Sequence, residues 1–229
     1  MTEPVAIPVI TVDGPGGVGK GTVARWISKR LMFNRLDSGA LYRLAAIAAL
    51  DRGIGPDAAD RIAALCHGLS INFGEDADGH ERITLDSIDV TQRLRLEATG
   101  EVASHLSVWP AVRNALLQRQ RNFRQRPGLV ADGRDMGTVV FTDARLKLFL
   151  DADVRARALR RQRQLSESGI AARIDDLCVQ IAARDARDRN RIVAPLRAAN
   201  DAITIDTSNL SVAEVEERVE TLLAVHGFT

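Results

Sequence analysis

The sequence predicts an α/β fold in which a doubly wound, five-stranded parallel sheet carries a small antiparallel β insertion. Three observations predict it. Short apolar, β-branched runs alternate with helical patterns, aspartates follow these runs, and one segment of different texture interrupts the alternation. The chain has 229 residues, which is long enough to bury a hydrophobic core without disulfides. We therefore expect a single domain over residues 1–229, consisting of a core and one insertion.

Five runs are expected to form the parallel strands, and they cover residues 9–12, 33–36, 129–131, 146–150 and 202–205. Ligands of doubly wound folds bind at the carboxyl ends of such strands. The aspartates that follow the first four predicted strands should therefore line one rim of the sheet, together with any ligand. They are Asp13, Asp37, Asp132 and Asp151.

Helical patterns separate the strands, and they cover residues 20–31, 38–50, 92–106, 110–124, 152–167, 174–191 and 212–225. Pro110 suits the first turn of its helix. Residues 69–91 contain three short strand patterns separated by turn residues, which predicts a small antiparallel insertion.

Composition excludes several classes of protein. The chain is 45% hydrophobic and 27% charged, as in soluble globular proteins, and its net charge of +1 creates no field that would attract nucleic acid or a membrane surface. No apolar run is long enough to span a bilayer, the N-terminus lacks the pattern of a signal peptide, and Cys66 and Cys178 match no metal or redox spacing. We expect a cytoplasmic monomer that binds neither nucleic acid nor a membrane.

A glycine-rich segment follows the first predicted strand and opens a helix. Glycines allow backbone N–H groups to turn inward around a polyphosphate, and the helix N-terminus adds a positive dipole end. Lys20 would supply a positive charge for the β and γ phosphates, and Thr22 a hydroxyl for Mg²⁺. The segment therefore predicts a binding site for ATP, as phosphoryl donor, with Mg²⁺, rather than an ordinary turn. It comprises Gly14, Pro15, Gly16, Gly17, Val18, Gly19, Lys20, Gly21 and Thr22.

Two charged segments at predicted strand ends are candidates for the acceptor site. In residues 37–43, Ser38 is most simply explained as an N-cap, whereas Arg43 is close enough to the rim to reach a phosphate. Residues 131–138 carry three charges and two glycines at a strand end. The alternative for them is a solvated loop in which Asp132 is a turn residue.

Two arginine-rich helices leave further alternatives open. Arg184, Asp188 and Arg191 share one helix face and form either a binding surface or a surface salt-bridge ladder, which Asp185, Arg187 and Arg189 would extend. The other helix forms either a lid that closes on phosphates or a solvated face. Its arginines are Arg155, Arg157, Arg160, Arg161 and Arg163.

Taken together, these segments resemble bacterial-type cytidylate kinases (CMP/dCMP kinases), a branch of the P-loop nucleoside monophosphate kinases. The resemblance covers nearly the whole chain. It rests on the Gly-Lys-Gly-Thr ending of the glycine-rich segment and on residues 37–43, 131–138, 184–191 and 193–196. It implies a sheet of the P-loop kinase type, a monophosphate-binding insertion at about 69–91 and a short lid at about 153–170.

The resemblance also implies roles for individual residues. The pyrimidine ring would be surrounded by Ser38, Arg113, Asp135 and Arg191, and the sugar would be held by Ser104, Arg184 and Asp188. Arg43 and Arg134 would hold the acceptor phosphate. Tyr42 and Asp132 are included in the candidate substrate site because they belong to the matching segments. The candidate catalytic residues are Lys20, Arg134, Arg184, Asp188 and Arg191, and Thr22 is the candidate metal-binding residue.

The implied reaction transfers the γ-phosphoryl group of ATP to CMP or dCMP, giving ADP and CDP or dCDP, in pyrimidine nucleotide metabolism. A UMP-preferring or broad pyrimidine kinase is the nearest alternative. A P-loop ATPase or switch that acts through a partner is a second alternative. An arginine-rich nucleic-acid-binding module is a third, and the net charge of +1 and the single tyrosine argue against it.

Overall fold

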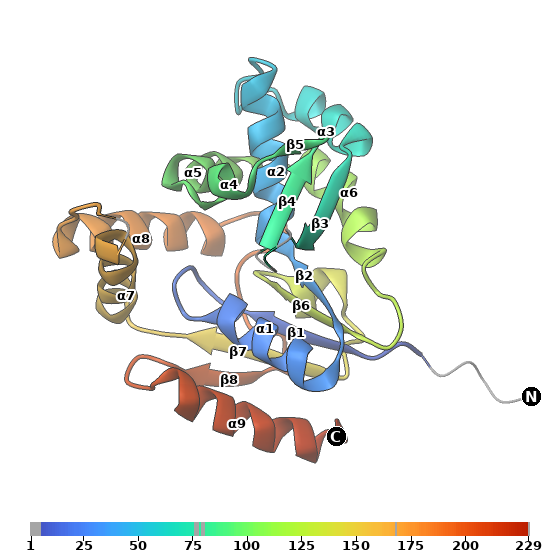
Figure 1. The fold of residues 1–229 in the computed structure, drawn as a ribbon, viewed down its shortest axis with the longest axis vertical. Coiled ribbons are helices and arrows are strands. Elements are labelled where there is room, and N and C mark those ends of the chain that lie inside the picture. The colour runs from blue at the N-terminus through green and yellow to red at the C-terminus, as the bar shows by residue number, and fades with distance from the viewer. Residues whose placement is uncertain (1–5, 76–77, 79–80, 168, 229) are drawn as a thin grey trace, which may run out of the picture. The chain divides into compact units, whose positions relative to one another are not determined.

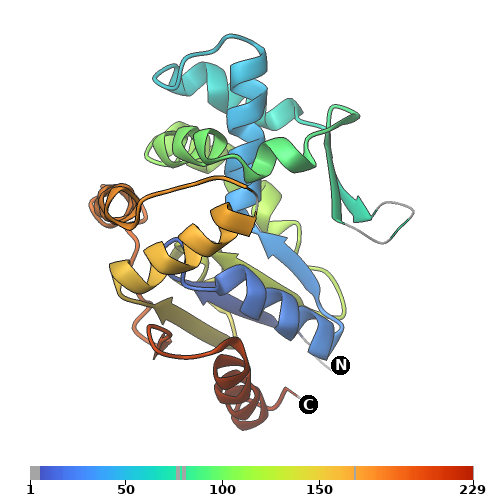
Figure 2. The same cartoon turned by 60° about the vertical axis from the view of Figure 1, so that its left-hand side comes forward.

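The computed structural model describes residues 6–75, 78, 81–167 and 169–228, and it divides into two compact units. Unit 1 is formed by Met1–Asp37 together with Arg121–Thr229, and unit 2 by Ser38–Gln120. Figures 1 and 2 show the chain from two directions.

Unit 1 is built on a five-stranded sheet with the strand order β2-β6-β1-β7-β8, in which every neighbouring pair is parallel. This arrangement confirms the predicted parallel sheet and places β1 at its centre. The strands are β1 (Val9–Asp13), β2 (Asn34–Asp37), β6 (Leu129–Gly133), β7 (Leu146–Asp151) and β8 (Ile203–Asp206).

Strand β1 is buried on both faces, as its apolar, β-branched sequence predicts. Ile10 and Val12 belong to a core that also contains side chains of α1 (Lys20–Leu31) and α9 (Val212–Val225). Successive side chains of a strand point to opposite faces. Thr11 and Asp13 accordingly point to the other face, which is covered by a short π-helical turn, η1 (Met136–Val140).

Two long helices complete unit 1. They are α7 (Val154–Glu167) and α8 (Ile174–Arg189), and they pack against each other (Figure 1). Both were expected from the sequence, although each is two residues shorter than predicted at one end. The turn η1 was not expected, because it is held by contacts with β1 that no local pattern reveals.

Unit 2 contains a three-stranded antiparallel sheet in the order β3-β4-β5, which confirms the predicted insertion. Its strands are β3 (Ile71–Glu75), β4 (Glu81–Leu85) and β5 (Ile88–Asp89). Its helices are α2 (Ser38–Asp51), α3 (Ala59–Gly68), α4 (Thr91–Arg95), α5 (Glu97–Leu106) and α6, which begins at Pro110 as predicted and ends at Arg121.

The sequence interpretation was wrong at two places in unit 2. Helix α3 was not predicted, although Ile62 and Cys66 are buried one turn apart on it. The helix expected over residues 92–106 is broken at Leu96, which has an extended backbone (φ −65°, ψ 141°). The carbonyl oxygens of Leu94 and Leu96 lie at this break, and both accept hydrogen bonds from Arg43. The carbonyl oxygen of Leu96 also accepts from the backbone N–H of Gly100.

In the ranges that the structure describes, no helix is both long and apolar enough to span a bilayer.

The start of α9 allows a test of the fold. Ser211 forms a capping box with Glu214, because each residue's side chain pairs with the backbone N–H of the other. Ser211→Ala should lower the free energy of unfolding by about 1 kcal/mol and the Tm by about 2–4 °C. Chemical denaturation and calorimetry measure both quantities. Ser166→Ala, an exposed serine within α7, is the matched control and should change neither. Equal effects of the two substitutions would contradict the capping role.

Candidate functional site

The glycine-rich loop joins the end of β1 to the start of α1. Its first residue, Gly14, has a φ of +146°, and a Cβ atom there would lie 2.0 Å from the carbonyl oxygen of Leu150. Gly17 and Gly19 also have positive φ angles, of +82° and +93°. Only glycine adopts this loop without strain. Within the described structure no side chain caps α1, so its first N–H groups remain suited to an anion.

Lys20 is the first residue of α1, and its side chain is buried. Its Nζ donates a hydrogen bond to the carbonyl oxygen of Pro15 at 2.7 Å, so the ammonium group lies over its own loop. Burial lowers the pKa of Lys20, and the nearby charge of Arg134 lowers it further, while Asp132 acts in the opposite direction. Because a polyphosphate in the loop would favour the charged form, this lysine is suited to anion binding.

Asp13, at the end of β1, connects this loop to the segment after β6. Its two carboxylate oxygens accept hydrogen bonds from the backbone N–H groups of Met136 and Gly137, both at 2.8 Å. Burial raises the pKa of Asp13 to about 7, although these two hydrogen bonds act against the increase. Gly137 is closely packed, since a Cβ atom there would lie 2.9 Å from Thr11 Oγ1. The segment 131–138 is therefore an ordered part of the rim, and not a solvated loop.

Asp132 is a buried carboxylate of this rim, and its Oδ2 atom has no hydrogen-bond partner among the described residues. Burial raises the pKa of Asp132, and the negative charge of Asp37 on the neighbouring strand raises it further. No group of three His, Cys, Asp or Glu side chains in the described ranges forms a complete metal site. A metal ion here would need ligands from a bound phosphate as well.

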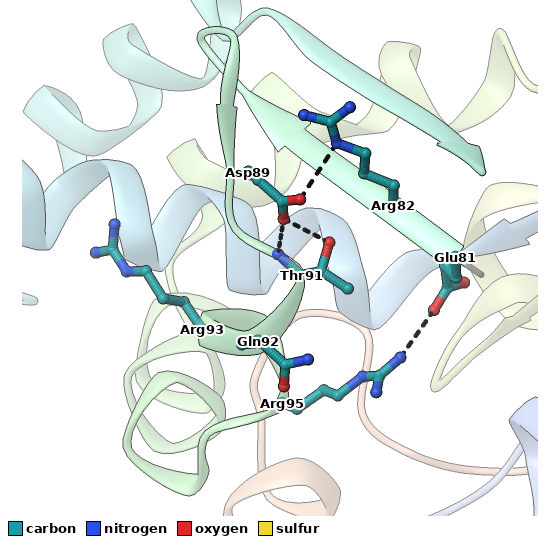
Figure 3. A pocket seen from close by; sticks show the side chains of 7 residues that line it. All are labelled: Glu81, Arg82, Asp89, Thr91, Gln92, Arg93 and Arg95. Atoms are coloured by element: carbon teal, nitrogen blue, oxygen red, sulfur yellow. Dashed lines mark hydrogen bonds and ion pairs between the residues drawn. The ribbon is translucent and has the colours of Figure 1, made fainter. Parts of the chain in front are cut away.

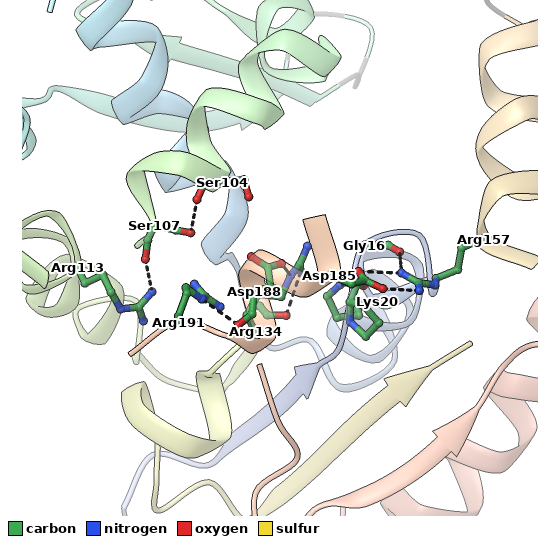
Figure 4. Close-up of polar contacts among 12 residues, drawn as sticks. Gly16, Lys20, Ser104, Ser107, Arg113, Arg134, Arg157, Asp185, Asp188 and Arg191 are labelled. Carbon is green, nitrogen blue, oxygen red and sulfur yellow. Dashed lines mark hydrogen bonds and ion pairs between the residues drawn. The ribbon is translucent and has the colours of Figure 1, made fainter. Parts of the chain in front are cut away.

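Helix α8 presents Asp188 toward the rim. Arg134 Nε donates to Asp188 Oδ2 at 2.9 Å (Figure 4), and Arg191 Nε donates to the carbonyl oxygen of Asp188 at 3.2 Å. Burial acts to raise the pKa of Asp188, but the surrounding positive charges outweigh burial and hold the pKa below its ordinary value. Those charges belong to Arg134, Arg191 and Arg184. Because Asp188 and Arg191 are buried, the alternative of a surface ladder is wrong for these two residues. The expectation that Arg191 shares a helix face with Asp188 is also wrong, since α8 ends at Arg189.

A buried ion pair joins α7 to α8. Arg157 Nη1 and Nη2 donate to the two carboxylate oxygens of Asp185, at 3.0 and 2.5 Å, and Nη1 also donates to the carbonyl oxygen of Gly16 in the loop (Figure 4). The expectation that Asp185 extends a surface ladder is therefore wrong. Arg157 does not belong to a solvated helix face, and Arg160 donates to Thr207.

Unit 2 brings together most of its own candidate residues. Ser38 Oγ donates to Gln120 Oε1 at 2.8 Å, and the guanidinium carbon of Arg113 lies 5.9 Å from the centre of the Tyr42 ring. Ser38 is the first residue inside α2, so the expectation that it is an N-cap is wrong. Arg43 Nη1 donates to the carbonyl oxygens of Leu94 and Leu96, at 2.7 and 3.2 Å.

Ser104 is a further candidate in unit 2. Its hydroxyl oxygen is buried and has no hydrogen-bond partner among the described residues. Its carbonyl oxygen accepts from Ser107 Oγ at 2.8 Å, and the carbonyl oxygen of Ser107 accepts from Arg113 Nη1 at 3.2 Å (Figure 4). The backbone at Ser104 is thus held by a hydrogen bond, and its buried hydroxyl is able to pair with a polar ligand group.

A separate cavity of about 570 Å³ lies on the insertion (Figure 3). Its charged side chains are largely exposed and pair with one another, as in Arg82–Asp89 at 3.2 Å and Arg95–Glu81 at 3.8 Å. We assign it no part in the candidate site. Its lining residues are Glu81, Arg82, Asp89, Thr91, Gln92, Arg93 and Arg95.

The sequence interpretation missed three features of these clusters. Asp13 was predicted at the rim, but its bonds to Met136 and Gly137 were not. The pairing of Arg157 with Asp185 had no signal in the spacing. Gln120 could have been found, because it lies seven residues after Arg113 and therefore on the same face of α6.

Comparisons with known proteins identify the family that this chain resembles. The family model described as "Cytidylate kinase" matches residues 10–224. The chain is 54% identical over 209 residues to a cytidylate kinase of Methylococcus capsulatus, which covers 91% of this chain and 93% of that protein. It is 52% identical over 217 residues to a cytidylate kinase of Burkholderia mallei, covering 95% and 92%. A cytidylate kinase of Vibrio vulnificus is 50% identical over 211 residues, covering 92% and 93%.

The buried ion pair gives a prediction about stability. Arg157→Met would leave the Asp185 carboxylate buried without its partner, so the free energy of unfolding should fall by about 3–5 kcal/mol. The double variant Arg157→Met/Asp185→Leu removes both charges and should recover most of the loss. Arg30→Met removes an exposed ion pair with Glu220 and should cost no more than about 1 kcal/mol.

Chemical denaturation of the four proteins measures these differences. An Arg157→Met variant as stable as Arg30→Met would show that the pair contributes nothing beyond an exposed one. A double variant no more stable than Arg157→Met would show that the unpaired charge is not the cause of the loss.

Proposed function

The chain belongs to the cytidylate kinase family, and from this premise we propose that it transfers the γ-phosphoryl group of ATP to CMP, giving ADP and CDP. The observation that carries the proposal is the family match over residues 10–224, which includes the glycine-rich loop and the charged segments 37–43, 131–138 and 184–191. We extend the proposal to dCMP as a second acceptor, and to a cytoplasmic enzyme that acts as a monomer without nucleic acid or membrane.

The donor would be bound by unit 1. The N–H groups of the glycine-rich loop and the start of α1 would bind the β and γ phosphates of ATP, and the ammonium group of Lys20 would pair with their charge. Burial lowers the pKa of Lys20, and the phosphate charge would restore its protonated form. Lys20 and Arg134 need not transfer a proton in this reaction. Their task is to hold the phosphates in line and neutralise them.

Mg²⁺ fits the residues that surround the loop. The Thr22 hydroxyl would be one ligand, and the unpartnered Oδ2 atom of buried Asp132 would accept hydrogen bonds from water bound to the ion. The ion would supply positive charge that offsets the repulsion between the phosphates of donor and acceptor.

The acceptor needs no general base. A nucleoside monophosphate has a second pKa near about 6, so at pH 7 its phosphate is mostly a dianion and already a nucleophile. Arg134 and Arg43 would bind this phosphate. Asp188 supports the role of Arg134, because its ionised carboxylate fixes the guanidinium group at Nε. Arg43 is fixed at Nη1 by the two carbonyl oxygens at the break between α4 and α5.

The nucleoside would be recognised by buried polar side chains. We assign the sugar to Ser104, Arg184 and Asp188, of which Ser104 has a buried hydroxyl suited to a ribose hydroxyl. Arg113 lies over the ring of Tyr42, and this contact supports its place in the base site. The residues assigned to the base are Ser38, Arg113, Asp135 and Arg191, and Tyr42 is assigned to the substrate site with them.

A coupled assay that follows ADP release tests the function. With ATP and Mg²⁺, the protein should phosphorylate CMP and dCMP and should use UMP with a kcat/KM lower by about tenfold or more. A protein that releases ADP at the same rate without an acceptor would be an ATPase. Comparable kcat/KM values for UMP and CMP would identify a broad pyrimidine kinase instead.

The role of Lys20 can be separated from its place in the fold. Lys20→Met keeps the length of the side chain but removes its charge, so kcat should fall by at least about 10²-fold. The Tm should stay near that of the wild type, because the charge of Lys20 is costly to bury. Lys29→Met, an exposed lysine of the same helix, is the matched control and should retain full activity. Normal turnover by folded Lys20→Met would remove the lysine from the mechanism.

A further inference from the structure

Helices α2 and α6 of unit 2 are joined by two side-chain contacts. Ser38 on α2 bonds to Gln120 on α6, and Tyr42 on α2 lies beneath the guanidinium group of Arg113 on α6. The spacing of four residues along α2 and seven along α6 places both contacts on the faces that the helices turn to each other. Ser38 and Gln120 are both buried, with 3% and 2% of their surfaces exposed. Gln120 has no role in the function proposed above.

The direction of the Ser38–Gln120 hydrogen bond follows from the second hydrogen bond that the Gln120 side chain makes. Gln120 Nε2 donates to the carbonyl oxygen of Leu116, and because a carbonyl oxygen can only accept, the amide nitrogen must lie on that side. Gln120 Oε1 therefore faces Ser38, and this oxygen also can only accept. Ser38 must be the donor. A serine hydroxyl has one proton, so Ser38 can offer a third group only the lone pairs of Oγ.

We propose that Gln120 is a positioning residue that determines base specificity. Its Oε1 atom accepts the one hydrogen bond that the Ser38 hydroxyl can donate, so toward the base Ser38 is an acceptor only. The proposal rests on the function proposed above, in which Ser38 contacts the pyrimidine. Cytosine presents an N4 amino group, which donates, where uracil presents O4, which accepts. A hydroxyl that can only accept pairs with the amino group of cytosine. Opposite uracil the same hydroxyl would face O4, which is also an acceptor, and no hydrogen bond would form.

Substitution of Gln120 tests this inference through the ratio of kcat/KM for CMP to kcat/KM for UMP. Gln120→Leu has a similar volume and no acceptor, so the Ser38 proton becomes available to O4 of uracil. The ratio should fall on the order of tenfold, through a gain for UMP relative to CMP. Gln120→Glu is the matched control. One carboxyl oxygen still accepts from Ser38, and the ratio should remain near that of the wild type.

A double-variant cycle separates action through Ser38 from a general loss of structure. Ser38→Ala removes the hydroxyl that Gln120 is proposed to direct. Adding Gln120→Leu to Ser38→Ala should then leave the CMP-to-UMP ratio unchanged, even if both variants are less stable than the wild type. A merely structural role for Gln120 would lower turnover of CMP and UMP equally in either background. Should Gln120→Leu fail to fold, Gln120→Met removes the acceptor with a more flexible side chain.

Calorimetric titration of CMP and UMP into each protein gives the ratio of the two dissociation constants, which measures the base preference in binding without turnover. The inference is supported if the preference for CMP falls in Gln120→Leu or Gln120→Met, is kept in Gln120→Glu and does not change further in the Ser38→Ala background. It is overturned if a wild type that prefers CMP keeps its ratio in Gln120→Leu and Gln120→Met. A wild type that binds CMP no better than UMP overturns it as well. Failure of the wild type to phosphorylate any pyrimidine monophosphate would instead contradict the proposed function, and the coupled assay shows this separately.

Discussion

The two hydrogen bonds accepted by the Asp13 carboxylate hold the rim of unit 1 together. They tie the end of the central strand to the backbone that follows the neighbouring strand β6, at Met136 and Gly137. This contact fixes the segment that carries Arg134, and Arg134 in turn bonds to Asp188 on α8. Asp185, three residues before Asp188, accepts a hydrogen bond from Arg157. Arg157 also donates to the carbonyl oxygen of Gly16 in the glycine-rich loop. The glycine-rich loop and α8 are thereby linked through one network of hydrogen bonds and charged groups.

The same rim is unfavourable for charge before a ligand binds. Burial raises the pKa values of Asp13 and Asp132 and lowers that of Lys20, so each of these groups is displaced toward its neutral form. Such pKa shifts are common in binding sites whose charged groups are buried away from water. A polyphosphate with its cation would bring the opposite charges to this place, and the binding free energy would include relief of this electrostatic cost.

The parts of the fold that follow from local pattern could be predicted from the sequence. The glycine-rich loop, the five core strands and the antiparallel insertion are encoded by residues adjacent in the chain, as in Val9–Asp13, where an apolar run ends at an aspartate. The turn η1, the break at Leu96 and the pairing of Arg157 with Asp185 could not be predicted. Each depends on a partner far along the chain, such as the carboxylate of Asp13 or the guanidinium of Arg43. The Arg-rich composition added to the difficulty, since 28 arginines give many equivalent pairings on paper.

The hydrogen bond between Ser38 and Gln120 has a topological consequence. Ser38 is the first residue of unit 2 and Gln120 is its last, so the bond joins two positions that are 82 residues apart in the sequence and adjacent in space. The chain therefore enters and leaves unit 2 at the same place, where Ser38 bonds to Gln120. A segment whose ends already meet can be lengthened, shortened or exchanged without pulling on the strands that flank it. The rest of unit 2 can thus change during evolution while the Ser38–Gln120 hydrogen bond, and with it the position of the Ser38 hydroxyl, is kept.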